Sequence, residues 1–185
     1  MYLIILGPPG AGKGTQSILI AEKLGLKHLS TGEILRKAVT DGTPLGLKAK
    51  EVLDTGNLVS DDIMVGIIKE AISADDAKKG FILDGFPRTI EQAKELDNIM
   101  ESLGYETAKV INITLDDNEL IRRMLGRGRV DDTEETIKNR LNVYKAQTAP
   151  VREHYGTKSA VFDIYGIGSI SEINGKILDV LKLPA

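Results

Sequence analysis

The sequence predicts an α/β fold in which a parallel β-sheet is flanked by helices. Short apolar runs of strand length alternate along the chain with segments whose apolar residues recur with a period near 3.6, which is typical of helices. A glycine-rich stretch follows the first apolar run directly, and residues 31–73 contain no convincing strand. Together these observations indicate a parallel sheet that carries a phosphate-binding loop and a small helical insertion.

The expected strands are five apolar runs, of which the second is short. They lie at residues 2–6, 27–30, 81–84, 109–115 and 160–165. Helical segments lie between them, and Gly25 and Gly104 follow two of these segments, where a glycine typically ends a helix. Ser60, followed by two aspartates, predicts the start of another helix. Pro150 interrupts the helical pattern that follows Asp132, so we expect that helix to kink or end at the proline.

The composition favours one globular domain and excludes several kinds of site. The chain has 185 residues, of which 42% are hydrophobic, enough to form a core. Its net charge is −3, with 24 basic and 27 acidic residues, which disfavours a nucleic-acid-binding domain. The absence of cysteine excludes disulfides, thiolate ligands for zinc and a cysteine nucleophile. No apolar run approaches membrane-spanning length and no basic leader opens the chain, so we expect a cytoplasmic protein without a membrane partner.

The stretch "GPPGAGKGTQ", from Gly7 to Gln16, joins the first expected strand to a helix. Its glycines permit backbone conformations in which successive N–H groups point at phosphate oxygens, at the positive end of the following helix. Lys13 adds a mobile positive charge for the outer phosphates of a nucleotide. The alternative is an ordinary glycine-rich turn with an incidental lysine. The usual pattern has Ser or Thr directly after the lysine to bind magnesium, whereas here Gly14 follows and Thr15 comes next.

The expected strand at residues 81–84 ends in Asp84 and continues into "GFPRTIEQ". A carboxylate at the carboxyl end of such a strand, beside a phosphate-binding loop, predicts a site for Mg²⁺, with contact through water. An aspartate that only starts a turn is the alternative. Arg88 follows in a loop held by Pro87, and from there it can reach the same phosphates.

Arginine is distributed unevenly along the chain. Six of the eight arginines lie in candidate functional stretches, whereas the sixteen lysines are scattered. These six are Arg36, Arg88, Arg123, Arg127, Arg129 and Arg140. Because the guanidinium group forks onto phosphate, this distribution favours phosphate binding over a merely solvated charged surface. Arg122 is expected to be a solvated neighbour.

The chain contains four stretches that resemble motifs of the adenylate kinase family, and they occur in the order found in that family. They are "GPPGAGKGTQ", "STGEILR", "DGFPRTIEQ" and "GRVDDTEETIKNRL". The chain therefore resembles that family over essentially its whole length. The resemblance implies a P-loop NTPase-type core of residues 1–29, 60–125 and 133–185, a helical insertion at 30–59 that binds the nucleoside monophosphate, and a very short lid at 126–132. It implies reversible phosphoryl transfer from MgATP to AMP, giving two ADP, by a monomer that uses Mg²⁺ and no zinc.

The resemblance also assigns site residues. ATP is expected to contact Gly10, Ala11, Gly12, Lys13, Gly14, Thr15, Arg127 and Gly168. AMP is expected to contact Thr31, Arg36, Asn57, Leu58, Val59, Gly85, Phe86, Pro87, Arg88, Gln92, Arg129 and Arg140. The expected catalytic residues are Lys13, Arg88, Arg123, Arg127, Arg129 and Arg140. Only Gly128 separates Arg127 from Arg129, where we expect several more residues in family members, so the lid has no room for strands of its own.

Several of these residues are equally explained by helix capping. In a capping box, a Ser or Thr at the start of a helix is followed three residues later by Glu or Gln. Such boxes begin at Ser30, Thr89 and Ser169. Gln92 would therefore share its amide between a cap and adenine, with which an amide can pair bidentately. Gly168 directly precedes the last cap, which alone could account for it. Asp131 and Asp132 precede a helix, which we expect them to cap while they orient the arginines.

Two other functions remain open. A UMP/CMP-type kinase would share most of the architecture, although Thr31 and Gln92 favour adenine over a pyrimidine. An ATP-driven switch or ATPase module would use the same phosphate-binding loop but would leave the arginine cluster and the insertion unexplained. The transfer needs no general base, because a phosphate monoester with a second pKa of about 6 is already an anion near neutral pH. His28 and His154 therefore need no catalytic role.

Overall fold

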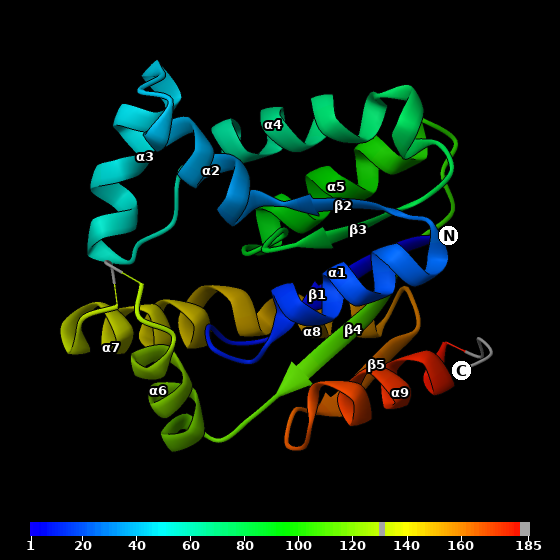
Figure 1. The fold of residues 1–185 in the computed structure, drawn as a ribbon. Coiled ribbons are helices and arrows are strands. Elements are labelled where there is room, and N and C mark those ends of the chain that lie inside the picture. Colours follow the sequence, from blue (N-terminus) through cyan, green and yellow to red (C-terminus); the bar gives the residue numbers. More distant parts are fainter. Residues whose placement is uncertain (130–131, 182–185) are drawn as a thin grey trace.

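The structure of the protein is a computed structural model that describes residues 1–129 and 132–181. Five parallel strands form one sheet in the order β2-β3-β1-β4-β5 (Figure 1). The strands are β1 (Tyr2–Leu6), β2 (Lys27–Ser30), β3 (Phe81–Asp84), β4 (Lys109–Thr114) and β5 (Val161–Tyr165). All five coincide with the predicted apolar runs, so the predicted α/β fold with a parallel sheet is confirmed. Only two ends differ, since β4 ends one residue earlier and β5 begins one residue later than predicted.

Alternate residues of the central strand face two separate layers of helices. Ile4 and Leu6 belong to one hydrophobic core cluster, whereas Leu3 and Ile5 belong to the other. The first layer contains α4 (Asp61–Ser73), α5 (Ile90–Ser102) and α8 (Ala149–Gly156), and the second contains α1 (Lys13–Leu24) and α9 (Ile170–Val180). Burial of β1 on both faces explains why its sequence is a continuous apolar run and not an alternating one.

Two helices, α2 (Thr31–Thr40) and α3 (Pro44–Thr55), lie between β2 and α4 and stand at one side of the sheet (Figure 1). Each begins at a side-chain cap. Ser30 Oγ accepts from the backbone N–H of Glu33 at 3.4 Å, and Thr43 Oγ1 accepts from that of Gly46 at 3.0 Å. As predicted, the chain between β2 and β3 is helical and contains no strand within the part of the chain that the structure describes.

The helical pattern after Asp132 is broken earlier than predicted. α6 (Asp117–Gly126) follows β4, and α7 (Glu134–Val143) ends in a π-helical segment, Tyr144–Thr148, before α8 begins. Pro150 lies in the first turn of α8, where its missing N–H costs little. The expected interruption is therefore present, with a new α-helix starting beside the proline, but it begins upstream at Tyr144 as a wider π turn that adjusts the hydrogen bonding before the proline is reached.

Among the described residues, no helix combines the length and the apolar character that crossing a lipid bilayer requires. A short 3₁₀ helix, Asp75–Ala77, completes the regular structure by leading from α4 towards β3.

The stretches singled out in the sequence meet at the carboxyl edge of the sheet. Asp84 is paired in register with Ile5 of β1 and with Ser30 of β2. The glycine-rich loop, the insertion and the loop after β3 therefore leave the sheet side by side. In open parallel sheets this edge is where ligands bind, and it is where the candidate site lies.

Two helical glycines provide a test of the packing between α2 and α3. A Cβ added to Gly46 would lie 2.0 Å from the carbonyl oxygen of Ala38, whereas one added to Gly66 in α4 would meet nothing within 4 Å. We expect Gly46→Ala to lower the free energy of unfolding by about 1–3 kcal/mol, because the two helices must separate. Gly66→Ala should raise it by about 0.5–1 kcal/mol through helix propensity. Urea denaturation of both variants measures these changes, and a Gly46→Ala protein as stable as its parent would contradict the packing.

Candidate active site

One cavity of about 420 Å³ opens at the carboxyl edge of the sheet. Of the predicted ATP contacts it is lined by Gly10, Gly12, Lys13, Gly14, Thr15 and Arg127. Of the predicted AMP contacts it is lined by Thr31, Arg36, Asn57, Leu58, Val59, Gly85, Pro87, Arg88, Gln92, Arg129 and Arg140. Asp84 and Arg123 line it as well. Stretches far apart in the sequence therefore meet around one space.

Three predicted site residues do not line the cavity. Ala11 and Phe86 are only 2% and 1% exposed, and their side chains belong to the two core clusters. Their chain neighbours line the cavity, so these two side chains anchor the loops from below. Gly168 lies in the loop between β5 and α9, where Ser169 and Glu172 form the predicted capping box in both directions.

The glycine-rich loop folds around the amine of Lys13. Gly12 is the N-cap of α1 with φ +91, a left-handed conformation that favours glycine. Lys13 Nζ donates to the carbonyl oxygens of Gly7 at 2.8 Å and Pro8 at 2.9 Å. The loop thus holds a cation at the positive end of a helix, which is the arrangement that binds phosphate.

Burial lowers the pKa of Lys13 from its ordinary 10.5 to about 8. The carboxylate of Asp84 opposes this shift, whereas three arginines of the cavity, Arg88, Arg127 and Arg129, add to it. An anion brought among these cations would favour the charged form of the lysine and raise its pKa again.

Asp84 ends β3 beside the first turn of α1. A Cβ added to Gly14 would lie 3.3 Å from Asp84 Oδ2, so a glycine after the lysine leaves room for the carboxylate. Proteins commonly hold Mg²⁺ with one or two carboxylates, together with substrate phosphates and water. In residues 1–129 and 132–181 no group of three or more His, Cys, Asp or Glu side chains is placed to hold a metal. Asp84 is therefore the carboxylate that could hold Mg²⁺ beside this loop, together with substrate phosphates and water.

The loop after β3 is tied to the start of α2. Thr31 Oγ1 donates to the Gly85 carbonyl oxygen at 2.9 Å, and Arg88 Nε donates to the same oxygen at 2.7 Å. Burial lowers the pKa of Arg88, and the nearby guanidinium groups of Arg140 and Arg36 lower it further. Arg36 and Arg140 are therefore each close enough to Arg88 to repel it, which makes this part of the cavity suited to a phosphate.

Gln92 lines the cavity, and both polar atoms of its amide are engaged. The residue is 2% exposed. Its Oε1 accepts from the backbone N–H of Arg88 at 2.7 Å, and its Nε2 donates to Asp61 Oδ1 at 2.7 Å. Thr89 caps α5, as predicted, by accepting from the backbone N–H of Gln92 at 3.1 Å. The side-chain oxygen of Gln92, however, accepts from the backbone N–H of Arg88 and not from that of Thr89. The second hydrogen bond of the predicted capping box therefore goes to the residue before the cap. One N–H and one lone pair of the amide remain for a ligand.

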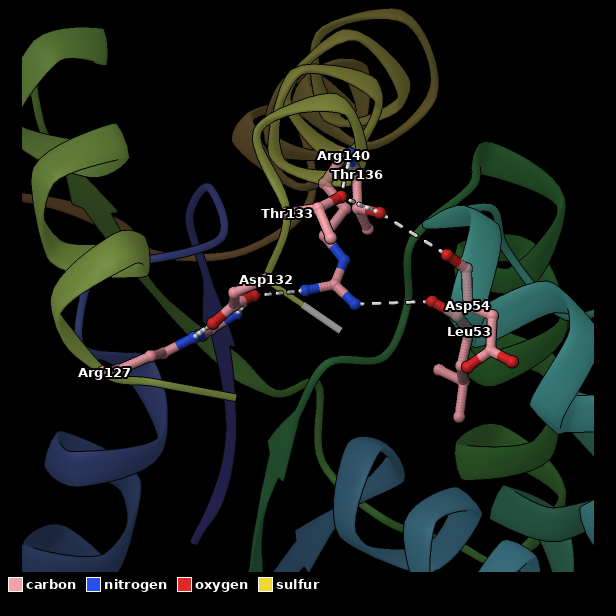
Figure 2. Close-up of polar contacts among 7 residues, drawn as sticks. All are labelled: Leu53, Asp54, Arg127, Asp132, Thr133, Thr136 and Arg140. Atoms are coloured by element: carbon pink, nitrogen blue, oxygen red, sulfur yellow. Dashed lines mark hydrogen bonds and ion pairs between the residues drawn. The ribbon is translucent and has the colours of Figure 1, made fainter. Parts of the chain in front are cut away.

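A buried carboxylate holds two of the arginines together. The side chain of Asp132 is 1% exposed and accepts from Arg127 Nη2 and Arg140 Nη1, both at 2.8 Å. Figure 2 shows Asp132 between the two guanidinium groups. Its predicted role in orienting arginines is confirmed, whereas its predicted capping role is wrong. The N-cap of α7 is Thr133, whose hydroxyl accepts from the N–H three residues on at 3.1 Å. Asp131 lies outside the described residues.

Helix α7 is also hydrogen-bonded to the end of α3. Asn139 Nδ2 donates to the carbonyl oxygen of the last residue of α3 at 2.7 Å. Thr136 Oγ1 donates to the carbonyl oxygen of Asp54 and Arg140 Nη2 to that of Leu53, each at 3.4 Å (Figure 2). The insertion is therefore connected directly to the helix that carries Arg140.

Comparison with known proteins identifies the family. A sequence model of adenylate kinase matches residues 5–160. The chain belongs to the adenylate kinase family. It is 46% identical over 181 residues to an adenylate kinase of Corynebacterium glutamicum, covering 98% of this chain and 99% of that protein. Against adenylate kinases of Leptospira biflexa and Stenotrophomonas maltophilia, identity is 49% over 180 residues and 43% over 186, covering 95% and 98% of this chain and 97% and 100% of those proteins. The resemblance inferred from the sequence is confirmed, and the chain is a nucleotide-binding kinase.

In this member of the family, Arg123 joins α6 to the loop between β5 and α9. Its Nε donates to Glu119 Oε1 at 2.6 Å, and its Nη2 donates to the Gly166 carbonyl oxygen at 3.0 Å. Hydrogen bonds from Arg122 and Arg123 lower the pKa of Glu119 to about 2. The side chain of Arg122 is 73% exposed and does not line the cavity, as predicted for a solvated neighbour.

Sequence reasoning missed part of the cavity of this adenylate kinase family member. The missed residues include Tyr144, Thr148, Leu35, Leu53 and Met64. Tyr144 lies four residues after Arg140 on the same helical run, a spacing that could have indicated it. Thr148 comes from the π-helical segment, and its Oγ1 donates to the Arg88 carbonyl oxygen at 2.9 Å. The apolar residues have no feature in the sequence that separates a cavity wall from a core.

The lowered pKa of Lys13 predicts proton uptake on nucleotide binding. At pH 8.5 the amine of the free protein is partly neutral, because its pKa is about 8. Bound phosphates favour the charged amine and raise its pKa, so binding of ATP should take up a fraction of a proton. The nucleotide phosphates are already fully ionised at this pH and contribute none. Calorimetric titration without magnesium, in buffers of different ionisation enthalpy, measures the uptake. It should vanish in Lys13→Met, and proton release by the parent protein would contradict the assignment.

Proposed function

We propose that the chain catalyses reversible phosphoryl transfer from MgATP to AMP, giving two ADP. The observation that carries the proposal is the convergence of two phosphate-binding regions on one cavity. One is the glycine-rich loop with Lys13, and the other contains Arg36 and Arg88. Membership of the adenylate kinase family supports the same reaction.

On the donor side, backbone N–H groups of the loop and the amine of Lys13 hold the ATP phosphates. The ATP contacts are Gly10, Ala11, Gly12, Lys13, Gly14, Thr15, Arg127 and Gly168. Ala11 acts through its backbone, because its side chain is buried. Asp84 holds Mg²⁺ through water, and the ion, when bound, supplies neutralisation of the charge on the phosphates.

On the acceptor side, guanidinium groups grip the AMP phosphate and an amide recognises the base. The AMP contacts are Thr31, Arg36, Asn57, Leu58, Val59, Gly85, Phe86, Pro87, Arg88, Gln92, Arg129 and Arg140. Arg36 and Arg88 take the phosphate, because both guanidinium groups line the cavity and lie close together. Gln92 offers its remaining N–H and lone pair to adenine.

Catalysis rests on position and positive charge. The reacting phosphates repel each other, and negative charge spreads over the oxygens of the transferred group in the transition state. The cations that offset this charge are Lys13, Arg88, Arg123, Arg127, Arg129 and Arg140. No side chain needs to remove a proton, since the accepting phosphate of AMP is already an anion.

The insertion at 30–59 and the short lid at 126–132 close over the nucleotides against a core of residues 1–29, 60–125 and 133–185. Closure of this kind excludes water, and adenylate kinase is a well-known example of it. Water exclusion limits loss of the transferred group to hydrolysis. The protein works as a monomer in the cytoplasm.

A coupled assay of ADP formation with MgATP and each of AMP, UMP and CMP tests the proposed reaction. AMP should be strongly preferred, because Gln92 and Thr31 match adenine. Lys13→Met should lose turnover by orders of magnitude while its circular dichroism stays that of the parent. A preference for UMP or CMP would assign the chain to the pyrimidine kinases, and rapid ATP hydrolysis without AMP would support an ATPase module.

The lid arginines should matter more in the transition state than in the ground state. Arg127→Ala and Arg129→Ala are therefore expected to lower kcat far more than they raise the KM for ATP. A lid this short covers little of the donor base, so ATP, GTP and CTP should be discriminated less sharply than monophosphates are. Steady-state kinetics at saturating AMP measure both effects. Arg122→Ala, which removes an exposed arginine outside the cavity, is the matched control. An unchanged kcat in Arg129→Ala would contradict a role of this arginine in the transition state.

A further inference from the structure

Asp61 lies just outside the cavity, yet it is bonded to the residue that faces the base. It is the first residue of α4, where the chain returns from the insertion to the core. Its Oδ1 accepts from Gln92 Nε2 at 2.7 Å, and its Oδ2 accepts from Thr89 Oγ1 at 2.9 Å. The Thr89 hydroxyl in turn accepts from the backbone N–H of Gln92 at 3.1 Å. These bonds form a closed ring that fixes the carboxylate against α5.

The ring leaves the amide of Gln92 only one orientation. Its partners on the two sides are an ionised carboxylate, which can only accept, and the backbone N–H of Arg88, which can only donate. Exchanging Oε1 and Nε2 would place oxygen against the Asp61 carboxylate and an NH₂ group against the Arg88 N–H. Both hydrogen bonds would become repulsive contacts within a residue that is 2% exposed. The fixed orientation is therefore a property of the site, and not a choice between equivalent arrangements.

The orientation matters because the 6-amino and 6-oxo purines present opposite patterns. Adenine offers an acceptor at N1 and a donor at its 6-amino group, whereas hypoxanthine offers a donor at N1 and an acceptor at O6. An amide that could turn over would match either pattern at the same base position. An amide with one fixed orientation matches only one of these patterns. Against the other pattern, its donor faces a donor and its acceptor faces an acceptor.

We propose that Asp61 is a positioning residue that makes the acceptor site select AMP over 6-oxo purine monophosphates, by fixing the orientation of the Gln92 amide. This inference rests on the proposed role of Gln92 in binding the adenine of AMP. Asp61 acts through Gln92 and does not touch the nucleotide. What matters is that its side chain is a pure hydrogen-bond acceptor.

The neighbouring Asp62 separates this role from a general effect of charge. Both aspartates lie in the first turn of α4, where a carboxylate interacts favourably with the helix dipole. Asp62 is exposed and does not line the cavity. Asp62→Asn therefore removes the same charge from the same helix turn without touching Gln92, and it is the matched control.

The experiment compares kcat and KM for AMP and for inosine monophosphate (IMP), whose base is hypoxanthine. Both are measured at saturating MgATP in the full-length protein. Asp61→Asn keeps the size of the side chain but can turn an NH₂ group or an oxygen towards Gln92. We expect its preference for AMP over IMP in kcat/KM to fall roughly tenfold, the scale of one hydrogen bond to a charged group. Most of the change should lie in the KM for AMP, with the KM for MgATP unaltered. Asp62→Asn should behave as the parent.

Two further variants distinguish positioning from packing. Asp61→Glu is larger but keeps a pure acceptor, so it should retain more of the preference than the isosteric Asp61→Asn. Packing alone predicts the reverse order. The double variant Asp61→Asn/Gln92→Ala should match Gln92→Ala, because Asp61 acts only through the amide. The midpoint of thermal unfolding, measured for each variant, shows whether a loss follows from destabilisation.

The outcomes separate this inference from the proposed function. If Gln92→Ala weakens AMP binding but Asp61→Asn keeps the full preference over IMP, the role of Asp61 is overturned and the proposed AMP site stands. The reverse order of the Asn and Glu variants would also overturn it. If Gln92→Ala leaves the KM for AMP unchanged, the proposed adenine contact fails, and the inference fails with it.

Discussion

The convergence of one lysine and six arginines on a single cavity is the constraint around which the molecule is arranged. Like charges repel more strongly where water is partly excluded. The lowered pKa values of Lys13 and Arg88 have burial as their first cause, and repulsion by neighbouring arginines adds to it. Such a cluster persists only if the fold holds the cations in place. Here they come from α1, α2, the loop after β3, α6 with the loop that follows it, and α7.

Carboxylates placed beside the cations offset part of this repulsion. Asp132 bridges Arg127 and Arg140, Glu119 pairs with Arg123, and Asp84 lies near Lys13 at the edge of the sheet. The three carboxylates differ in what they contact. Asp132 and Glu119 orient guanidinium groups through hydrogen bonds, whereas Asp84 remains placed beside the phosphate-binding loop, where a metal can bind.

The sequence was sufficient wherever the pattern is local. Strand β1 is buried on both faces and therefore leaves a continuous apolar run, and the glycine-rich loop is a contiguous stretch. Pairing between distant side chains was not accessible. Nothing in the sequence indicates that Gln92 would meet Asp61, 31 residues away, or that Thr133 would cap α7 and free Asp132 for two arginines. The π-helical segment was missed as well, because a proline marks a break but not the turn that compensates for it.

Asp132 has a consequence for any phosphate that binds the two arginines beside it. It accepts hydrogen bonds from Arg127 and Arg140 that a phosphate oxygen could otherwise accept. Each guanidinium group has five N–H donors, so a phosphate can use the remaining ones or replace the carboxylate at those that Asp132 holds. Where it replaces the carboxylate, the net gain is smaller than that of a phosphate meeting bare guanidinium groups. When such a phosphate leaves, the same carboxylate is in place to accept those N–H groups again. Asp132 is thus an internal competitor that remains attached to the chain, and it competes with any phosphate oxygen that approaches the donors it holds.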